Sequence, residues 1–294
     1  MRRGALARPH LALALLTLTG AAMAIDLAPL WDFNRPDESE RRLQAALATA
    51  QGDDALVLRT QIARTHGLRR DFDTARRLLG EMEPALATAG PEVQARHALE
   101  LGRSWVSATH APGQLTPEAK ALATQAYDRA LAVAKAARLD GLAIDAIHMR
   151  AFIDTAPTDQ LRWGQEALQI ALASDQPAAR RWEGSIRNNI GVALNQLGRH
   201  DEALAQLQQT LALRERTGSA EAVHVARWMV AHTLRLLGRV DEALALQLDL
   251  ARAGDATGQP DPSVFEELEA LYRARGENDL ASRWAARRSA AAGR

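Results

Sequence analysis

Histidine, acidic and hydroxyl side chains that could carry out catalysis or bind a metal are scattered through this chain of 294 residues. The chain has no cysteine, which excludes thiol nucleophiles and disulfide bonds. It contains neither the G-x-S-x-G motif of serine hydrolases nor the H-E-x-x-H motif of zinc proteases. Phosphate-binding loops of the G-x-x-x-x-G-K and G-x-G-x-x-G types are also missing. The sequence therefore predicts a protein that is not an enzyme and needs no cofactor.

The eight histidines lack the spacing that metal binding on a helix requires. Two histidine ligands on one helix are typically four residues apart, and no two of these histidines have that spacing. His224 and His232 share a helix face, but they lie two turns apart, which is too far for one ion. We therefore expect no metal site.

Two acidic pairs, Asp201–Glu202 and Asp241–Glu242, could act as general acids and bases. Each pair, however, follows a G-R-x segment and precedes A-L. This context is typical of a helix start, where carboxylates cap free N–H groups and face the positive end of the helix dipole. We expect Asp201 to cap the helix that follows it.

The first 24 residues have the three parts of a secretory signal peptide. Three arginines precede an apolar stretch over residues 11–19, and Ala22-Met23-Ala24 forms a small-x-small cleavage site. The apolar stretch is too short for a transmembrane helix. The sequence thus predicts cleavage of residues 1–24 and export, to the periplasm if the source is a bacterium with two membranes.

The charge of the remaining chain argues against two classes of partner. Without residues 1–24 it carries 33 basic and 36 acidic side chains, a net charge of −3 with histidine neutral. A nucleic-acid-binding protein normally shows a basic surplus, and so does a protein that docks on anionic lipid. We expect neither nucleic-acid binding nor stable membrane insertion after cleavage.

Residues 185–216 show how helices would position the remaining side chains. Ile186, Ile190 and Leu194 fall at helical spacing, and a second helix follows Gly198. Gly191 lies within the first helix, where glycine costs about 1 kcal/mol relative to alanine. The close approach of a neighbouring helix would explain this glycine.

The turn of this helical pair recurs along the chain. The segment Gly198–Leu204 is repeated as Gly238–Leu244 after 40 residues, and Gly276–Ala281 repeats it again after 38 residues. A further copy, Arg70–Ala75, lacks the turn glycine. Recurrence at such a period is the signature of a repeat architecture.

The pattern N-x-x-G-x-x-L-x-x-x-G-R-x-x-E-A-L over residues 188–204 resembles a tetratricopeptide repeat. The resemblance implies an all-α fold, a right-handed α-solenoid of about six helix-turn-helix hairpins, over residues 52–290. We expect almost no strand, because no long stretch alternates with period two. Residues 25–51 would form an N-terminal segment with a capping helix over about 38–50. Its Trp31 should pack against the first hairpin and cover the end of the solenoid.

The resemblance also implies a site, because first helices of this family line a concave groove that holds ligands. Transferred to the clearest copies, the groove would present asparagines for a peptide backbone, arginines for carboxylates and an aromatic anchor. The candidate groove residues are Arg64, Arg103, Asn188, Asn195, Trp228, His232 and Arg235.

Two functions remain open on the sequence. The first is a non-enzymatic scaffold of the cell envelope that binds a protein or peptide in its concave groove. The alternative is a sensor or regulatory protein whose solenoid changes curvature when a small peptide or metabolite binds. The sequence names neither the partner nor the biological process.

Overall fold

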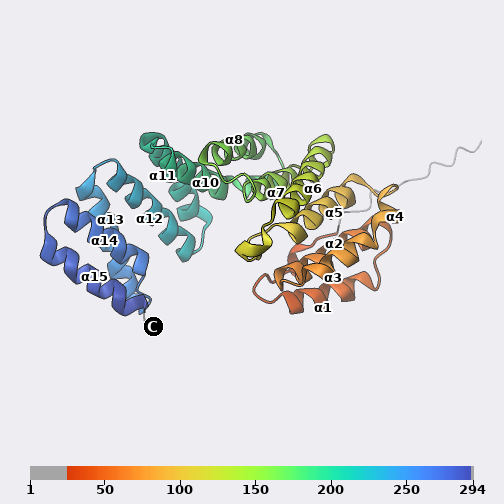
Figure 1. The fold of residues 1–294 in the computed structure, drawn as a ribbon, viewed down its shortest axis with the longest axis horizontal. Coiled ribbons are helices and arrows are strands. Elements are labelled where there is room, and N and C mark those ends of the chain that lie inside the picture. Colours follow the sequence, from red (N-terminus) through yellow and green to blue (C-terminus); the bar gives the residue numbers. More distant parts are fainter. Residues whose placement is uncertain (1–24, 293–294) are drawn as a thin grey trace, which may run out of the picture.

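The computed structural model describes residues 25–292, so the predicted signal peptide over residues 1–24 lies outside the described residues. The chain forms an arch of helices, with α1 and α3 at one end and α14 and α15 at the other (Figure 1). No strand occurs among the described residues. None of the helices within this range is both long and apolar enough to span a membrane.

Six helical hairpins follow one another along the arch, and neighbouring helices in sequence pack together. This confirms the predicted all-α solenoid. The hairpins pair α2 (Gly52–Leu68) with α3 (Phe72–Gly80), α5 (Pro91–Trp105) with α6 (Pro117–Ala136), α7 (Asp140–Arg150) with α8 (Pro157–Ala173), α10 (Glu183–Gln196) with α11 (His200–Thr217), α12 (Ala220–Leu236) with α13 (Val240–Thr257), and α14 (Pro262–Ala274) with α15 (Asn278–Ala292). The remaining elements are η1 (Ala28–Leu30), α1 (Pro36–Leu47), α4 (Glu83–Leu86), η2 (Pro112–Gln114) and α9 (Pro177–Arg180).

The recurring turn has one backbone geometry throughout. Gly198, Gly238 and Gly276 have φ angles of 73°, 73° and 75°, in the left-handed region that glycine tolerates best. The next residue donates its N–H to a carbonyl five residues earlier, as in Arg199 N–H to Leu194 O at 2.9 Å, which closes a Schellman motif. Arg70, with φ of 66°, occupies the same place without glycine's freedom.

The acidic pairs start the second helices, but they do not cap them. Helix α11 begins at His200, and its N-cap Arg199 makes no side-chain capping bond. The predicted cap by Asp201 is therefore wrong, because this residue already lies in the first turn. Glu202 instead accepts two hydrogen bonds from the Arg199 guanidinium, both at 2.7 Å. Arg239 and Glu242 repeat this pair, so the acids stabilise the turn and the helix start.

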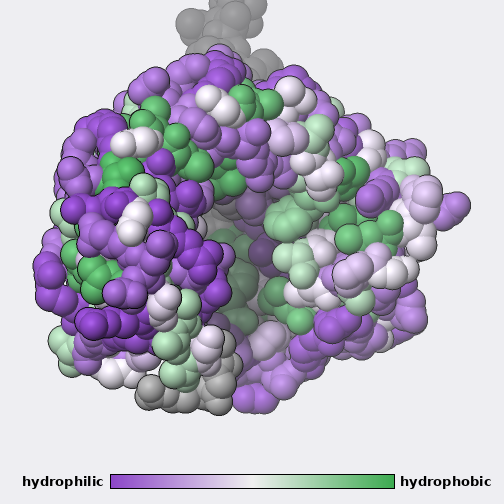
Figure 2. Space-filling model, turned by 60° about the vertical axis from the view of Figure 1, so that its left-hand side comes forward, coloured by the Kyte–Doolittle hydropathy of each residue, from purple (hydrophilic) through white to green (hydrophobic). Residues whose placement is uncertain are grey.

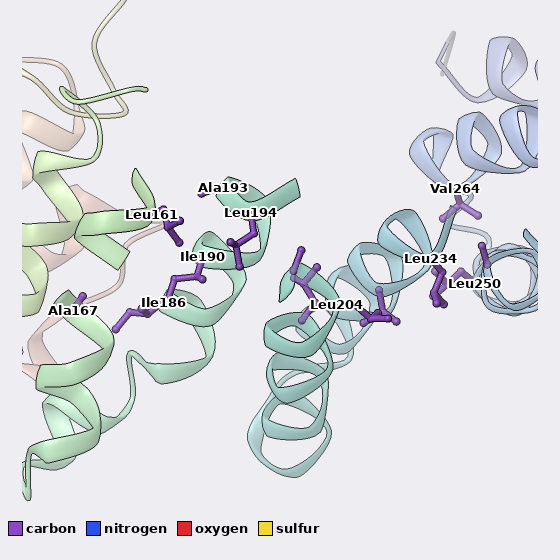
Figure 3. Close-up of a cluster of buried hydrophobic side chains, with 14 of the residues drawn as sticks. Leu161, Ala167, Ile186, Ile190, Ala193, Leu194, Leu204, Leu234, Leu250 and Val264 are labelled. Atoms are coloured by element: carbon purple, nitrogen blue, oxygen red, sulfur yellow. The ribbon is translucent and has the colours of Figure 1, made fainter. Parts of the chain in front are cut away.

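Close helix packing explains the glycine inside α10. A Cβ atom at Gly191 would lie 2.6 Å from Cγ of Leu207 on α11, which confirms the predicted close approach. The two helices belong to an apolar core that runs from α7 to α15 (Figure 3). Ile186, Ile190 and Leu194 of α10 point into this core, as the helical spacing predicts.

The N-terminal segment packs on the first hairpin. Helix α1 begins at Pro36, two residues before the predicted start, and Leu43 of α1 is fully buried against α2. Trp31 lies in the same cluster and donates its indole N–H to Gln61 Oε1 at 3.2 Å. Trp31 therefore does pack against the first hairpin, as expected.

Candidate binding groove

Three adjoining cavities lie along the first helices α2, α5, α7, α10 and α12. His148 of α7 and Trp182, just before α10, line all three, so the cavities form one continuous groove. Figure 2 shows the molecule hollowed at its centre, with both hydrophobic and hydrophilic side chains on the wall of the hollow. We call the three parts the charged, the apolar and the amide cavity.

The charged cavity has a volume of about 250 Å³ and contains a cluster of four ionised side chains. Arg64 of α2 and Arg103 of α5 both donate to Glu100 Oε1, at 3.2 and 2.6 Å. Arg103 also donates to Asp145 of α7. This charged quartet of Arg64, Glu100, Arg103 and Asp145 therefore joins three consecutive hairpins.

The electrostatics of the charged quartet follow from burial and mutual pairing. Burial favours the neutral form of each group, and it lowers the pKa of Arg64. For Arg103 the carboxylates of Asp145 and Glu100 outweigh burial and raise the pKa. For Asp145 burial raises the pKa, but the Arg103 charge outweighs it and holds the pKa below the usual range. With two cations and two anions, the charged quartet has no net charge.

The charged quartet leaves two buried polar atoms without partners among the described residues. These are Glu100 Oε2, an acceptor, and Arg64 Nε, a donor. Buried polar groups are normally hydrogen-bonded, so such atoms next to a cavity mark places where water or a ligand group can bind.

The apolar cavity lies between α7, α8 and α10 and has a volume of about 300 Å³. No Asp, Glu, Lys or Arg side chain lines it. Burial lowers the pKa of His148, so this imidazole is neutral at pH 7. The apolar side chains of the wall are Ile144, Ile147, Ala151, Phe152, Trp163, Ala167, Trp182, Ile186 and Val192.

The amide cavity, of about 440 Å³, lies between α10 and α12. Asn188 and Asn189 line it side by side, and within residues 25–292 their side-chain amides form no hydrogen bond. Val225 of α12 lies opposite and is 50% exposed. Free amides beside exposed apolar surface suit a polypeptide, whose backbone needs both donors and acceptors.

Three of the seven predicted groove residues, Arg64, Arg103 and Asn188, line these cavities. The two arginines, however, already bond internal carboxylates, so a partner's carboxylate would have to compete with Glu100 and Asp145. Their binding role stays a prediction.

The other four predicted residues form contacts between hairpins, outside the three cavities. Asn195 donates to Thr233 Oγ1 at 2.7 Å. His232 and Arg235 bond Glu267 of α14, at 2.9 and 2.8 Å, and Trp228 stacks on His232 with ring centroids 5.1 Å apart. Their role in partner binding also stays a prediction.

The sequence argument missed His148, Trp182 and Asn189. Helix α7 belongs to an irregular part of the chain, so the repeat gave no register for His148. Trp182 comes immediately before α10 as its N-cap, so it lies outside the helical pattern of the repeat. Asn189 is adjacent to the predicted Asn188, and the doubled asparagine was the one available signal for it.

The model of the tetratricopeptide repeat family matches residues 182–253, which span α10 to α13. Residues 182–253 carry tetratricopeptide repeats. No curated protein matches the sequence. The matched repeats provide one wall of the apolar cavity and most of the amide cavity, whereas the charged cavity is lined, apart from Trp182, by residues upstream of them.

Three solved structures share this arrangement of helices. A STAND signal-transduction ATPase from Pyrococcus horikoshii with a tetratricopeptide repeat sensor has a TM-score of 0.65 at 11% identity, and the match covers 86% of this chain but 39% of that one. A Rap protein in complex with Competence and Sporulation Factor has a TM-score of 0.53 at 15% identity, covering 89% and 73%. Aspartyl phosphate phosphatase F from Bacillus subtilis has a TM-score of 0.53 at 14% identity, covering 90% and 78%. At these identities the likeness shows the fold alone.

Proposed function

We propose that this tetratricopeptide-repeat protein is a non-enzymatic scaffold that holds an extended segment of a protein or peptide in its concave groove. The continuity of the groove carries the proposal, because His148 and Trp182 join the three cavities into one channel over five consecutive first helices. A channel of this kind is long enough for several residues of a polypeptide, whereas a metabolite would occupy a single cavity.

The side chains of the groove support the same proposal. The unpartnered amides of Asn188 and Asn189 can hydrogen-bond a peptide backbone of any sequence. Trp182 and Phe152 offer apolar surface, and Phe152 is 37% exposed. A groove that the fold already forms loses little entropy when a partner docks. Among residues 25–292, no group of three or more histidine and acidic side chains is arranged to hold a metal ion.

The cellular location belongs to the proposal as well. We propose that the scaffold works in the cell envelope, and the signal-peptide pattern of residues 1–24 is the only support for this location. The net charge of −3 after cleavage fits a protein partner better than nucleic acid.

A library of displayed random peptides tests the binding function. The expected result is enrichment of linear peptides on the wild-type chain, with binding lowered roughly ten-fold in the double variant Asn188→Ala, Asn189→Ala, which loses about two hydrogen bonds. The matched control is Gln208→Ala on α11, whose side chain is exposed outside the three cavities and should leave binding unchanged. Equal loss in both variants, or no enrichment at all, would contradict the proposal.

A ligand-responsive sensor is the second candidate. The structural neighbour from P. horikoshii is named for a tetratricopeptide repeat sensor, and the first helices on either side of the apolar cavity share no polar tie. A sensor of this kind would change its radius of gyration in small-angle scattering on binding a ligand, whereas a rigid scaffold would not.

A further inference from the structure

Polar contacts tie the first helices of consecutive hairpins together at four of the five junctions. Each tie joins side chains of two neighbouring first helices. The ties are Arg64–Glu100 between α2 and α5, Arg103–Asp145 between α5 and α7, Asn195–Thr233 between α10 and α12, and His232 and Arg235 with Glu267 between α12 and α14.

The junction between α7 and α10 is the exception. Within residues 25–292, no hydrogen bond or ion pair joins these two helices. The aromatic contact between His148 and Trp182, with ring centroids 5.4 Å apart, bridges the junction instead. Beside this contact lies the apolar cavity, so the one junction without a polar tie is also the one with an empty apolar volume.

The lining of the apolar cavity selects an uncharged, apolar group. A carboxylate or ammonium placed there would lose its hydration, because no ionised side chain lines the cavity and its imidazole is neutral. A volume of about 300 Å³ lies at the lower end of the range for ligand pockets and fits one large side chain. Trp163 and Trp182 supply the aromatic surface against which such a side chain would pack.

The rim of the cavity offers hydrogen bonds that an apolar side chain alone would not use. The amides of Gln160 on α8 and Asn189 on α10 line it, and neither has a side-chain hydrogen bond among the described residues. A peptide backbone next to the buried side chain could satisfy both amides. Charged or apolar small molecules lack this combination.

We propose that the apolar cavity is the anchor pocket for one large uncharged apolar side chain, aromatic or branched aliphatic, of the polypeptide in the groove. Asn189 and Gln160 hold the backbone on either side of that residue. The buried side chain packs between α7 and α10 and supplies the contact that this junction lacks. The inference rests on the proposed function, since it specifies what the groove selects.

Blocked amino acids test the pocket without requiring a whole partner. N-acetyl-phenylalaninamide and N-acetyl-leucinamide are titrated into the full chain, and binding is followed by ligand-observed NMR. The charged counterparts are the N-acetyl α-amides of aspartic acid, with its side-chain carboxylate free, and of lysine. We expect the apolar amides to bind roughly ten-fold or more tightly than the charged ones, because only the apolar side chains gain from burial. Equal binding of all four amides would overturn the proposal.

Variants that fill the apolar cavity with a large side chain test whether the amides bind there. Ala151→Trp, at the residue that follows α7, and Gln160→Trp on α8 place a bulky ring in the apolar cavity from two sides, and at least one should fold, because both positions are partly exposed. Each is expected to weaken binding of N-acetyl-phenylalaninamide by about ten-fold or more. Gln208→Trp, at an exposed position outside the three cavities, should leave that binding unchanged. Undiminished binding in a folded cavity-filled variant would overturn the proposal.

A displayed peptide separates this inference from the proposed function. If selected peptides bind the wild-type chain and Ala151→Trp equally well, the scaffold stands and the anchor pocket is overturned. A second outcome is that no peptide binds the wild-type chain while the apolar amides still bind the cavity. In that case the scaffold function and the assignment of the cavity as a peptide anchor are both wrong. The preference of the cavity for apolar groups would still be correct.

Discussion

The two ends of the solenoid differ in how closely they follow the repeat. From α10 onward the hairpins are regular: glycine makes each recurring turn, and an arginine–glutamate pair follows it in α11 and α13. Before α10 the chain departs from the repeat, with Arg70 in place of a turn glycine and a long connection between α5 and α6. The family model matches the regular part alone.

The regular and irregular parts of the solenoid line different parts of the groove. Apart from Trp182, the charged cavity is lined by the irregular part, and the apolar cavity lies at the boundary between the two parts. In the regular part, the carboxylate of Glu267 has hydrogen-bond partners on both oxygens. Buried carboxylate oxygens without a hydrogen-bond partner among the described residues occur in both parts, at Glu100 Oε2 in the irregular part and at Glu269 Oε2 in the regular part. The regular repeats thus supply the amide cavity with its unpartnered asparagines, whereas departures from the repeat supply most of the charged cavity and part of the apolar cavity.

The largest effect should come from the charged quartet. Glu100→Ala leaves Arg64 and Arg103 buried with only Asp145 to balance them. Removing one partner from a buried ionic cluster costs about 3–5 kcal/mol, and we expect a loss of that size in the free energy of unfolding from urea titration. Arg77→Ala, at the exposed ion pair with Glu81 at the end of α3, is the control and should cost about 0–1 kcal/mol. A cost below about 1 kcal/mol for Glu100→Ala would mean that the ionic contacts of the charged quartet do not stabilise the packing of the first three hairpins.

Acid should weaken the regular end through Glu267. Burial raises the pKa of this carboxyl, but the bonds from His232 and Arg235 outweigh burial and lower the pKa to about 2. Because the folded pKa is below the unfolded one, the stabilisation is present at pH 7 and is lost as the pH falls from about 4.5 to about 2. The loss should amount to roughly 3 kcal/mol.

The variant Glu267→Gln isolates this contribution. It cannot ionise, so its free energy of unfolding should depend less steeply on pH than that of the wild type between pH 4.5 and pH 2. Identical slopes for the two chains, measured by urea unfolding at each pH, would show that the Glu267 bonds do not hold the fifth and sixth hairpins together.

The smallest effects should appear at the turns, with opposite signs at the two ends. Arg70→Gly relieves a left-handed residue in the irregular part and should raise the free energy of unfolding by about 1 kcal/mol. Gly238→Ala introduces the same strain in the regular part and should lower it by about 1 kcal/mol. Thermal unfolding measures both. Effects of the same sign would contradict the view that the two turns share one backbone geometry.

Sequence reasoning succeeded where side chains repeat at a fixed interval. The glycine turns, the close packing at Gly191 and the apolar stripe of α10 followed from spacing, because local backbone geometry and helical periodicity determine them. The family resemblance placed Asn188 in the groove, and this residue lines the amide cavity, while its binding role stays a prediction.

The sequence could not show how side chains from different hairpins meet. Glu267 lies 32 residues from its partner Arg235, and no local pattern indicates that pairing. His148 and Trp182 come from hairpins whose connections are irregular, so their shared position in the groove depends on packing over the whole fold. Asp201 was assigned to the cap because the sequence alone does not distinguish the residue before a helix from its first turn.

Crosslinking from the centre of the groove tests the central claim most directly. A photo-reactive amino acid at position 189 lies at the junction of the apolar and amide cavities, and the same amino acid at position 208 lies outside them. We predict that position 189 crosslinks in cells to one linear segment of a single partner, which mass spectrometry maps, and that position 208 does not. Crosslinks of equal yield to the same partner from both positions, or to scattered sites on many proteins, would contradict binding in the groove.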